Sequence, residues 1–106
     1  MSQVVVVASF EVQEGKAAEA EAALRETIEA THAEAGCLNY ALHRDRDDAN
    51  TFVLVEKWTS QVALDAHFTQ PYVAALGEKA VGLLAAPASI RFCEPVPVGN
   101  PTKGTL

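Results

Sequence analysis

Two segments of this chain are apolar at four consecutive positions, and this feature limits the folds that the chain can adopt. Residues 4–7 read VVVV and residues 52–55 read FVLV. They lie within residues 3–12 and 51–58, which have the β-branched and aromatic content of strands. Because successive side chains of a strand point to opposite faces, each strand presents apolar groups on both faces of its sheet. Neither face of the predicted sheet is suited to contact with water.

The first helix is predicted from apolar side chains that recur at steps of three and four residues. Residues 16–35 are rich in Ala and Glu, and Gly36 is expected to end the helix. The apolar stripe of this helix consists of Ala17, Ala20, Leu24, Ile28 and Thr31.

Two further strands complete the predicted sheet. Residues 37–45 and 51–58 flank the polar turn RDDAN, which indicates an antiparallel hairpin. Residues 88–96, ASIRFCEPV, are the last predicted strand.

Two short helices are expected between the hairpin and the last strand. Thr59 or Ser60 is a suitable N-cap for a helix that ends near Phe68. Pro71 is suited to the first turn of another helix, which runs to about Leu84.

The order strand, helix, strand, strand, two helices, strand predicts an α+β fold. Its expected form is a ferredoxin-like antiparallel sheet with the helices on one face. Residues 1–95 are expected to form one domain. Residues 96–106 are rich in Pro and Gly and are expected to form an extended C-terminal tail.

The helices can cover only one of the two apolar faces of this sheet. A second copy of the chain is the simplest cover for the other face, because closed homodimers dominate soluble oligomers. The sequence therefore predicts a homodimer in which two sheets pack face to face through a large apolar interface. A hydrophobic partner of different sequence is the alternative.

Charge and segment composition exclude several classes of partner. The chain has 14 acidic and 8 basic residues, so it lacks the basic footprint of a protein that binds nucleic acid. No apolar run approaches the roughly 20 residues of a membrane span, and the N-terminus does not read as a signal peptide, so we expect a cytoplasmic protein. Cys37 and Cys93 lack metal-like spacing and are expected to be reduced thiols; no metal site is predicted.

Glu56 interrupts an otherwise apolar run and raises the question of what it faces. It shares one face of its strand with Leu54 and Trp58. If the helix after Ser60 runs back over the sheet, His67 lies about 10 Å along it, above Glu56 and beside Trp58. Glu56 and His67 then either satisfy each other inside the core or form part of a functional pocket. A solvated charge at the end of the strand is the third interpretation.

Four other residues are candidates for the same space. Tyr40 and Asn39 point to opposite faces of their strand, so at most one of them looks toward the helices. Phe68 follows His67 on the short helix, and Tyr72 begins the next helix. Each of them also has an ordinary structural role as a core or surface residue.

Four segments together resemble the antibiotic biosynthesis monooxygenase family, which includes quinol monooxygenases: VVVASFEVQEGK, EAGCLNY, FVLVEKW and ALDAHF. The resemblance covers residues 3 to about 95. It implies a dimeric α+β barrel with a pocket between sheet and helices. It also implies oxygenation of quinols or anthrone-like phenols without a cofactor. Haem-degrading relatives have an Asn near the end of the first strand, where this chain has Ala8, Ser9 and Phe10.

The resemblance suggests a role for each candidate residue in a reaction between a small aromatic substrate and O₂. His67 is the expected base, because an unperturbed imidazole has a pKa of about 6.5, and Glu56 is expected to orient it. Trp58 is expected to stack on the substrate, and Tyr40 or Asn39 to donate to an oxygen. Phe68 and Tyr72 are further candidates for contact with the substrate.

Two other functions use the same pocket. One is isomerisation or hydrolysis of a small carbonyl or phosphorylated metabolite, for which Lys57 and Arg91 are the nearest cations in the sequence. The other is binding of a small molecule without catalysis.

Overall fold

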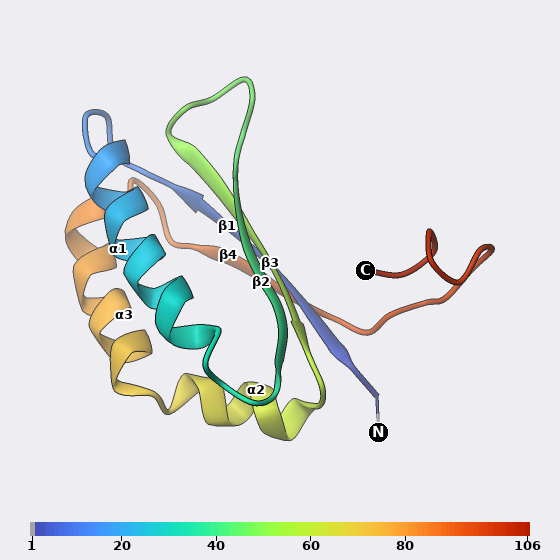
Figure 1. The fold of residues 1–106 in the computed structure, drawn as a ribbon. Helices are drawn as coiled ribbons and strands as arrows, with labels where there is room; N and C mark the ends of the chain where they lie inside the picture. The colour runs from blue at the N-terminus through green and yellow to red at the C-terminus, as the bar shows by residue number, and fades with distance from the viewer. Residues whose placement is uncertain (1) are drawn as a thin grey trace.

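The computed structural model describes residues 2–106 and contains the elements expected from the sequence, in the predicted order (Figure 1). One antiparallel sheet carries the three helices on one side, and the C-terminal residues lie on the other side. The elements are β1 (Val4–Glu11), α1 (Ala17–Thr31), β2 (Cys37–Arg44), β3 (Thr51–Trp58), α2 (Gln61–Phe68), α3 (Pro71–Leu83) and β4 (Ser89–Cys93). The predicted α+β, ferredoxin-like fold is confirmed.

The strand order β2-β3-β1-β4 places β2 and β4 at the two edges of the sheet. Directly paired residues of adjacent strands point to the same face. Tyr40 pairs with Glu56, Glu56 with Val6, and Val6 with Phe92, so these four side chains form one row across the helix-covered face. The row connects the candidate site on β3 with both edges of the sheet.

The core lies between the sheet and the helices. On β3 the side chains of Phe52, Leu54, Glu56 and Trp58 are buried, and those between them are only half-buried. Leu64 of α2 packs on the cluster that contains Trp58. A second cluster packs α1 and α3 against Phe52; its other members are Val12, Ala20, Ala23, Leu24 and Leu83.

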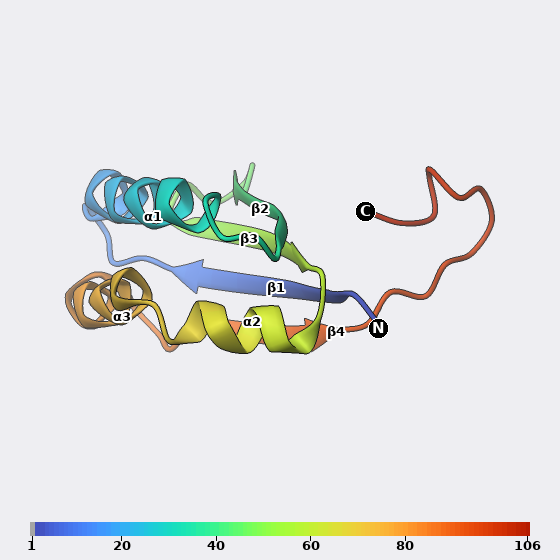
Figure 2. The same cartoon turned by 60° about the horizontal axis from the view of Figure 1, so that its bottom comes forward.

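The opposite face of the sheet carries no helix (Figure 2). Val5, Val7, Val53 and Val55 lie there and are half-buried within the chain. Asn39 pairs with Lys57 and therefore belongs to this face as well. We call the surface formed by the four valines the bare face.

Helix α1 ends at Thr31, four residues earlier than the sequence pattern predicts. Residues 32–36 leave the helix through successive turns, with Glu34 N–H bonded to the Thr31 carbonyl and Cys37 N–H to the Glu34 carbonyl. Ser60 caps α2 as expected, and its Oγ accepts a hydrogen bond from Ala63 N at 3.2 Å. These two local features bring Glu34 and α2 together.

Residues 96–106 contain no helix or strand, and unlike the extended tail expected from the sequence they are not extended throughout. Gly99 has a positive φ of 73°, and Gly104 N–H bonds the Asn100 carbonyl at 2.7 Å, so the chain turns back. Lys57 Nζ then donates to the backbone oxygen of Leu106. No helix within residues 2–106 has both the length and the apolar composition to cross a membrane.

Candidate active site around His67

The His67 side chain lies near the end of α2, where only 2% of it is exposed. Four aromatic rings surround the imidazole: Trp58 with its centroid at 4.7 Å, Tyr40 at 5.4 Å, Phe68 at 5.5 Å and Tyr72 at 6.5 Å. Histidine is less often fully buried than the aliphatic residues, so an imidazole enclosed by aromatic side chains is a candidate for a functional role. It is a suitable arrangement for a base that acts on a planar substrate.

The carboxylate that hydrogen-bonds His67 belongs to Glu34. Glu34 Oε2 lies 2.8 Å from His67 Nδ1, and Tyr72 Oη donates to the same oxygen. The side chain of Glu34 is 13% exposed and comes from the turns that follow α1. One carboxylate oxygen of Glu34 is therefore within hydrogen-bond distance of two polar side chains.

Glu56 lies below the helices and is not a solvated strand end, but its hydrogen bond goes to Trp58 and not to His67. Trp58 Nε1 donates to Glu56 Oε1 at 3.0 Å, and Glu56 is 5% exposed. Burial raises the pKa of the Glu56 carboxyl, and the Glu34 charge also acts in that direction. The hydrogen bond from Trp58 and the proximity of His67 partly offset this rise in the pKa.

The remaining titratable side chains of the cluster are kept protonated. Burial, followed by the Glu56 charge, raises the pKa of Tyr40 well above its usual range. Burial and the contact with Glu34 raise the pKa of Tyr72 to about 12. Burial and the charges of Glu34 and Glu56 raise the pKa of the Cys37 thiol. Near neutral pH the two phenols are therefore hydrogen-bond donors.

The structure brings together most of the residues that the sequence predicts for the site. His67, Glu56, Trp58, Tyr40, Phe68 and Tyr72 all lie within or beside this cluster. Asn39 does not, because it lies on the bare face while its neighbour Tyr40 points toward the helices. The structure thus distinguishes the two residues that the sequence left as alternatives.

Glu34 is the functional candidate that sequence reasoning missed, because residue 34 falls within the helix predicted for residues 16–35 and outside its apolar stripe. Gly36, two residues after Glu34, is the residue that could have indicated the position of Glu34. A Cβ on Gly36 would lie 2.3 Å from Ala63 Cβ, so the chain passes against α2 at a point where only glycine fits. A glycine needed for close approach to α2 indicates that its neighbours also lie near that helix.

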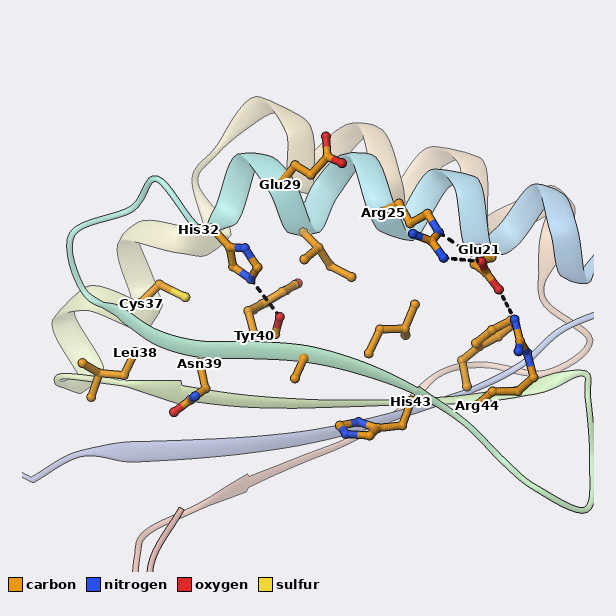
Figure 3. A pocket seen from close by; sticks show the side chains of 14 residues that line it. Glu21, Arg25, Glu29, His32, Cys37, Leu38, Asn39, Tyr40, His43 and Arg44 are labelled. Atoms are coloured by element: carbon orange, nitrogen blue, oxygen red, sulfur yellow. Dashed lines mark hydrogen bonds and ion pairs between the residues drawn. The ribbon is translucent and has the colours of Figure 1, made fainter.

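A separate open groove of about 780 Å³ runs between α1 and edge strand β2 (Figure 3). Arg25 and Arg44 both bond the Glu21 carboxylate at one end, and His32 Nε2 lies 3.0 Å from the Tyr40 carbonyl at the other. Tyr40 and Asn39 line this groove, whereas the other predicted site residues do not. No group of three or more His, Cys, Asp or Glu side chains in residues 2–106 is arranged to hold a metal ion.

Comparison with known proteins identifies the family of this chain. Residues 3–79 match the model of the antibiotic biosynthesis monooxygenase family. An uncharacterised protein of Synechocystis is 36% identical over 89 residues, which are 84% of this chain and 60% of that protein. The chain therefore spans only about three fifths of the length of this curated relative.

Solved structures agree with this assignment. A Mycobacterium tuberculosis protein superposes with a TM-score of 0.87 at 29% identity, covering 93% of this chain and all of that one. A structure described as an antibiotic biosynthesis monooxygenase superposes with a TM-score of 0.84 at 26% identity, covering 89% of this chain and 99% of the other. This chain belongs to the antibiotic biosynthesis monooxygenase family.

Proposed function

We propose that this protein is a homodimeric monooxygenase that oxidises an electron-rich phenolic aromatic, such as a quinol or an anthrone, with O₂ and without a metal or organic cofactor. The observation that carries the proposal is the buried imidazole of His67, bonded to a carboxylate and enclosed by aromatic rings. Membership of the monooxygenase family supports the reaction class.

The reaction requires a base, a hydrogen-bond donor and a site from which water is excluded. Deprotonation of the phenol, or of the activated ring carbon, gives an electron-rich anion that can transfer an electron to O₂. One oxygen atom then becomes a carbonyl oxygen on the substrate. The other leaves as water with two hydrogens from the substrate, so the substrate itself supplies the reducing electrons.

His67 is the proposed base, since its Nδ1 is engaged by Glu34 and leaves Nε2 as the nitrogen that can accept a proton. Tyr40, a protonated phenol whose ring lies 5.4 Å from the imidazole, is the proposed donor to the developing oxyanion. Trp58 and Phe68 supply ring faces on which a planar substrate stacks.

The approach to this site is proposed to run past Phe68 and Phe92. Their rings are 6.3 Å apart in an edge-to-face arrangement, and they are 48% and 58% exposed. Phe68 also contacts the His67 ring, so the pair extends the ring cluster from the buried imidazole to the surface. A half-exposed aromatic pair of this kind suits a flat apolar substrate better than a charged one.

The positions of the nearest cations favour oxygenation over isomerisation of a phosphorylated metabolite. Lys57 and Arg91 pair with Val5 and Val7, so both lie on the bare face, away from His67. A phosphorylated substrate bound among the rings therefore lacks a cationic partner from these two residues.

The dimer belongs to the proposal because the bare face presents four half-buried valines without helical cover. A second copy that packs its own bare face there forms an isologous interface and a closed barrel of two sheets.

The proposal is tested by measuring O₂ uptake of the metal-stripped protein with a panel of quinols and anthrones. We expect turnover with at least one of them, and a loss of about 10²- to 10⁴-fold in His67→Ala, the usual contribution of a general base. His32→Ala is the matched control, because His32 is exposed and bonds only the Tyr40 carbonyl. Absence of O₂ uptake across the panel, or equal rates in wild type and His67→Ala, contradicts the proposal.

A further inference from the structure

We infer that Glu34 and Tyr72 act as positioning residues for His67, in which Glu34 fixes the tautomer of the imidazole and Tyr72 limits the negative charge that Glu34 presents to it. We call these two residues the tuning pair. The inference rests on the proposed function in one respect, since it assigns His67 the role of base. The physical coupling among the three side chains is independent of any substrate.

The first step of the argument is that both donors reach the same atom. His67 Nδ1 is 2.8 Å from Glu34 Oε2, and the phenolic O–H of Tyr72 donates to that oxygen too. A carboxylate oxygen has lone pairs for two donors, whereas a phenol hydrogen-bonded to a carboxylate can only be the donor. An ionised carboxylate can only accept hydrogen bonds, so a neutral His67 bonded to it carries its proton on Nδ1 and leaves Nε2 as the acceptor.

The second step is that the three side chains come from three separate parts of the fold. Glu34 lies in the turns after α1, His67 near the end of α2, and Tyr72 at the start of α3. Ser60 holds the start of α2, and Gly36 allows the Glu34 turn to pass directly against that helix. Their convergence on one oxygen is a product of tertiary structure, and each contact can be removed without deleting a helix or strand.

The third step concerns how the two hydrogen bonds compete. A hydrogen bond to the charged form of a carboxylate stabilises that charge and makes the carboxylate a weaker base. When Tyr72 donates to Glu34, less of the negative charge is available to stabilise a protonated His67. Removal of the phenol O–H should therefore strengthen the ion pair, and removal of the Glu34 charge should abolish it. The two changes act on His67 in opposite directions.

Other titratable groups around His67 do not share this role. Tyr40 and Cys37 on β2 remain protonated near neutral pH because burial raises the pKa of each. Glu56 on β3 is hydrogen-bonded to Trp58 rather than to either member of the tuning pair. Glu56 can titrate, so the measurement needs a version in which that group is neutral.

The test is an NMR titration of the His67 imidazole in wild type, Glu34→Gln, Tyr72→Phe and the double variant. We expect Glu34→Gln to lower the titration midpoint by about 1 to 3 pH units, the usual effect of an adjacent opposite charge. Tyr72→Phe should raise the midpoint. In the double variant Tyr72→Phe should have no further effect, because the charge that it modulates is absent.

A matched control and a second background make the result specific. Tyr40→Phe removes another phenol whose ring lies near His67, but one without a hydrogen bond to Glu34, and it should not raise the midpoint. The Tyr72→Phe effect should persist in a Glu56→Gln background. If Tyr72→Phe lowers the midpoint or leaves it unchanged in a folded protein, the inference is wrong even where Glu34→Gln fails to fold.

Failure of this inference is distinguishable from failure of the proposed function. The titration needs neither substrate nor O₂, so opposite shifts without O₂ uptake support the tuning pair and contradict the oxygenase. If O₂ uptake is found, the acidic limb of kcat/KM against pH should move in parallel with the midpoint in each variant. Uptake whose pH profile does not follow the measured midpoint contradicts His67 as the base, whereas an unchanged midpoint in Tyr72→Phe overturns the tuning pair alone.

Discussion

Glu56 accepts a hydrogen bond from the indole N–H of Trp58, two residues along the same strand, with Trp58 Nε1 and Glu56 Oε1 3.0 Å apart. Both side chains point to the helix-covered face and are buried. A neutral indole donor leaves the carboxylate without a bonded cation, and burial accordingly raises its pKa. Glu56 is thus a buried carboxylate whose ionisation opposes folding.

This difference predicts how Glu56→Gln changes stability with pH. A carboxyl whose pKa is raised in the folded state binds more protons folded than unfolded, so it reduces stability as pH rises through that interval. The substitution should therefore be nearly neutral at pH 4 and increasingly stabilising toward pH 7. The gain is about 1.4 kcal/mol for each pH unit between the folded and unfolded pKa values. Urea unfolding of both proteins across this range measures it.

Glu26→Gln is the matched control for this prediction. Glu26 is exposed and lies 3.5 Å from Lys79, a surface contact that contributes little to stability. The control should show no comparable dependence of the difference on pH. A difference between Glu56→Gln and wild type that stays constant from pH 4 to 7 contradicts a raised pKa for Glu56.

Gly36→Ala should disturb the site through packing alone. The new Cβ lies 2.3 Å from Ala63 Cβ and 3.2 Å from Thr59 Oγ1, so α2 has to move away from the Glu34 turn. We expect a loss of about 1 to 3 kcal/mol, as for other overpacked sites, together with a changed NMR environment of His67. Thermal unfolding and the His67 imidazole resonances measure the two effects.

Gly77→Ala in α3 is the control for crowding, because an added Cβ there meets no atom within 4 Å. It should stabilise the protein by about 0.5 to 1 kcal/mol, since alanine is the better helix former. If Gly36→Ala behaves like Gly77→Ala, the close approach of α2 to the Glu34 turn is not a constraint.

The fold was predictable because its signals are local and repeated. The β-branched and aromatic run of β3, the Ser60 cap and Pro71 at the first turn of α3 all lie within a few residues of the structure they specify. The position of His67 followed from the rise of a helix and of a strand. The partner of His67 did not, because Glu34 is 33 residues away and arrives through a turn whose path depends on tertiary packing.

The end of α1 is a second feature that local sequence did not predict correctly. Ala-rich and Glu-rich sequence continues to residue 35, so propensity favours helix beyond Thr31. The chain leaves the helix earlier because it must turn into β2, whose first residue pairs with Trp58. Local propensity reports a preference of a few tenths of a kcal/mol per residue, which such a tertiary requirement readily overrides.

A charge on the bare face should prevent the proposed dimer. Val53 lies on the face without helices and pairs with His43 and Ser9, so Val53→Asp leaves the helix-side core unchanged. An aspartate at this position puts a charge among the valines that the proposed interface buries, and we expect a monomer or an aggregate in place of the dimer. Sedimentation velocity of wild type and Val53→Asp measures this. A folded wild-type monomer at micromolar concentration contradicts the dimer itself.

Removal of the tail, by ending the chain after Glu94, should weaken the dimer. Val96 and Val98 are 74% and 70% exposed, and the tail lies on the side of the sheet away from the helices, beside the proposed interface. If a partner subunit buries these valines, their loss raises the dimer dissociation constant at least about tenfold, because each buried valine contributes about 1.5 kcal/mol or more. Lys57→Met removes the bond to the backbone oxygen of Leu106 but keeps the tail, so it separates the loss of this bond from the loss of the tail itself. Sedimentation equilibrium should show weaker association for the truncated chain than for Lys57→Met. An unchanged dissociation constant after truncation shows that the tail takes no part in the interface.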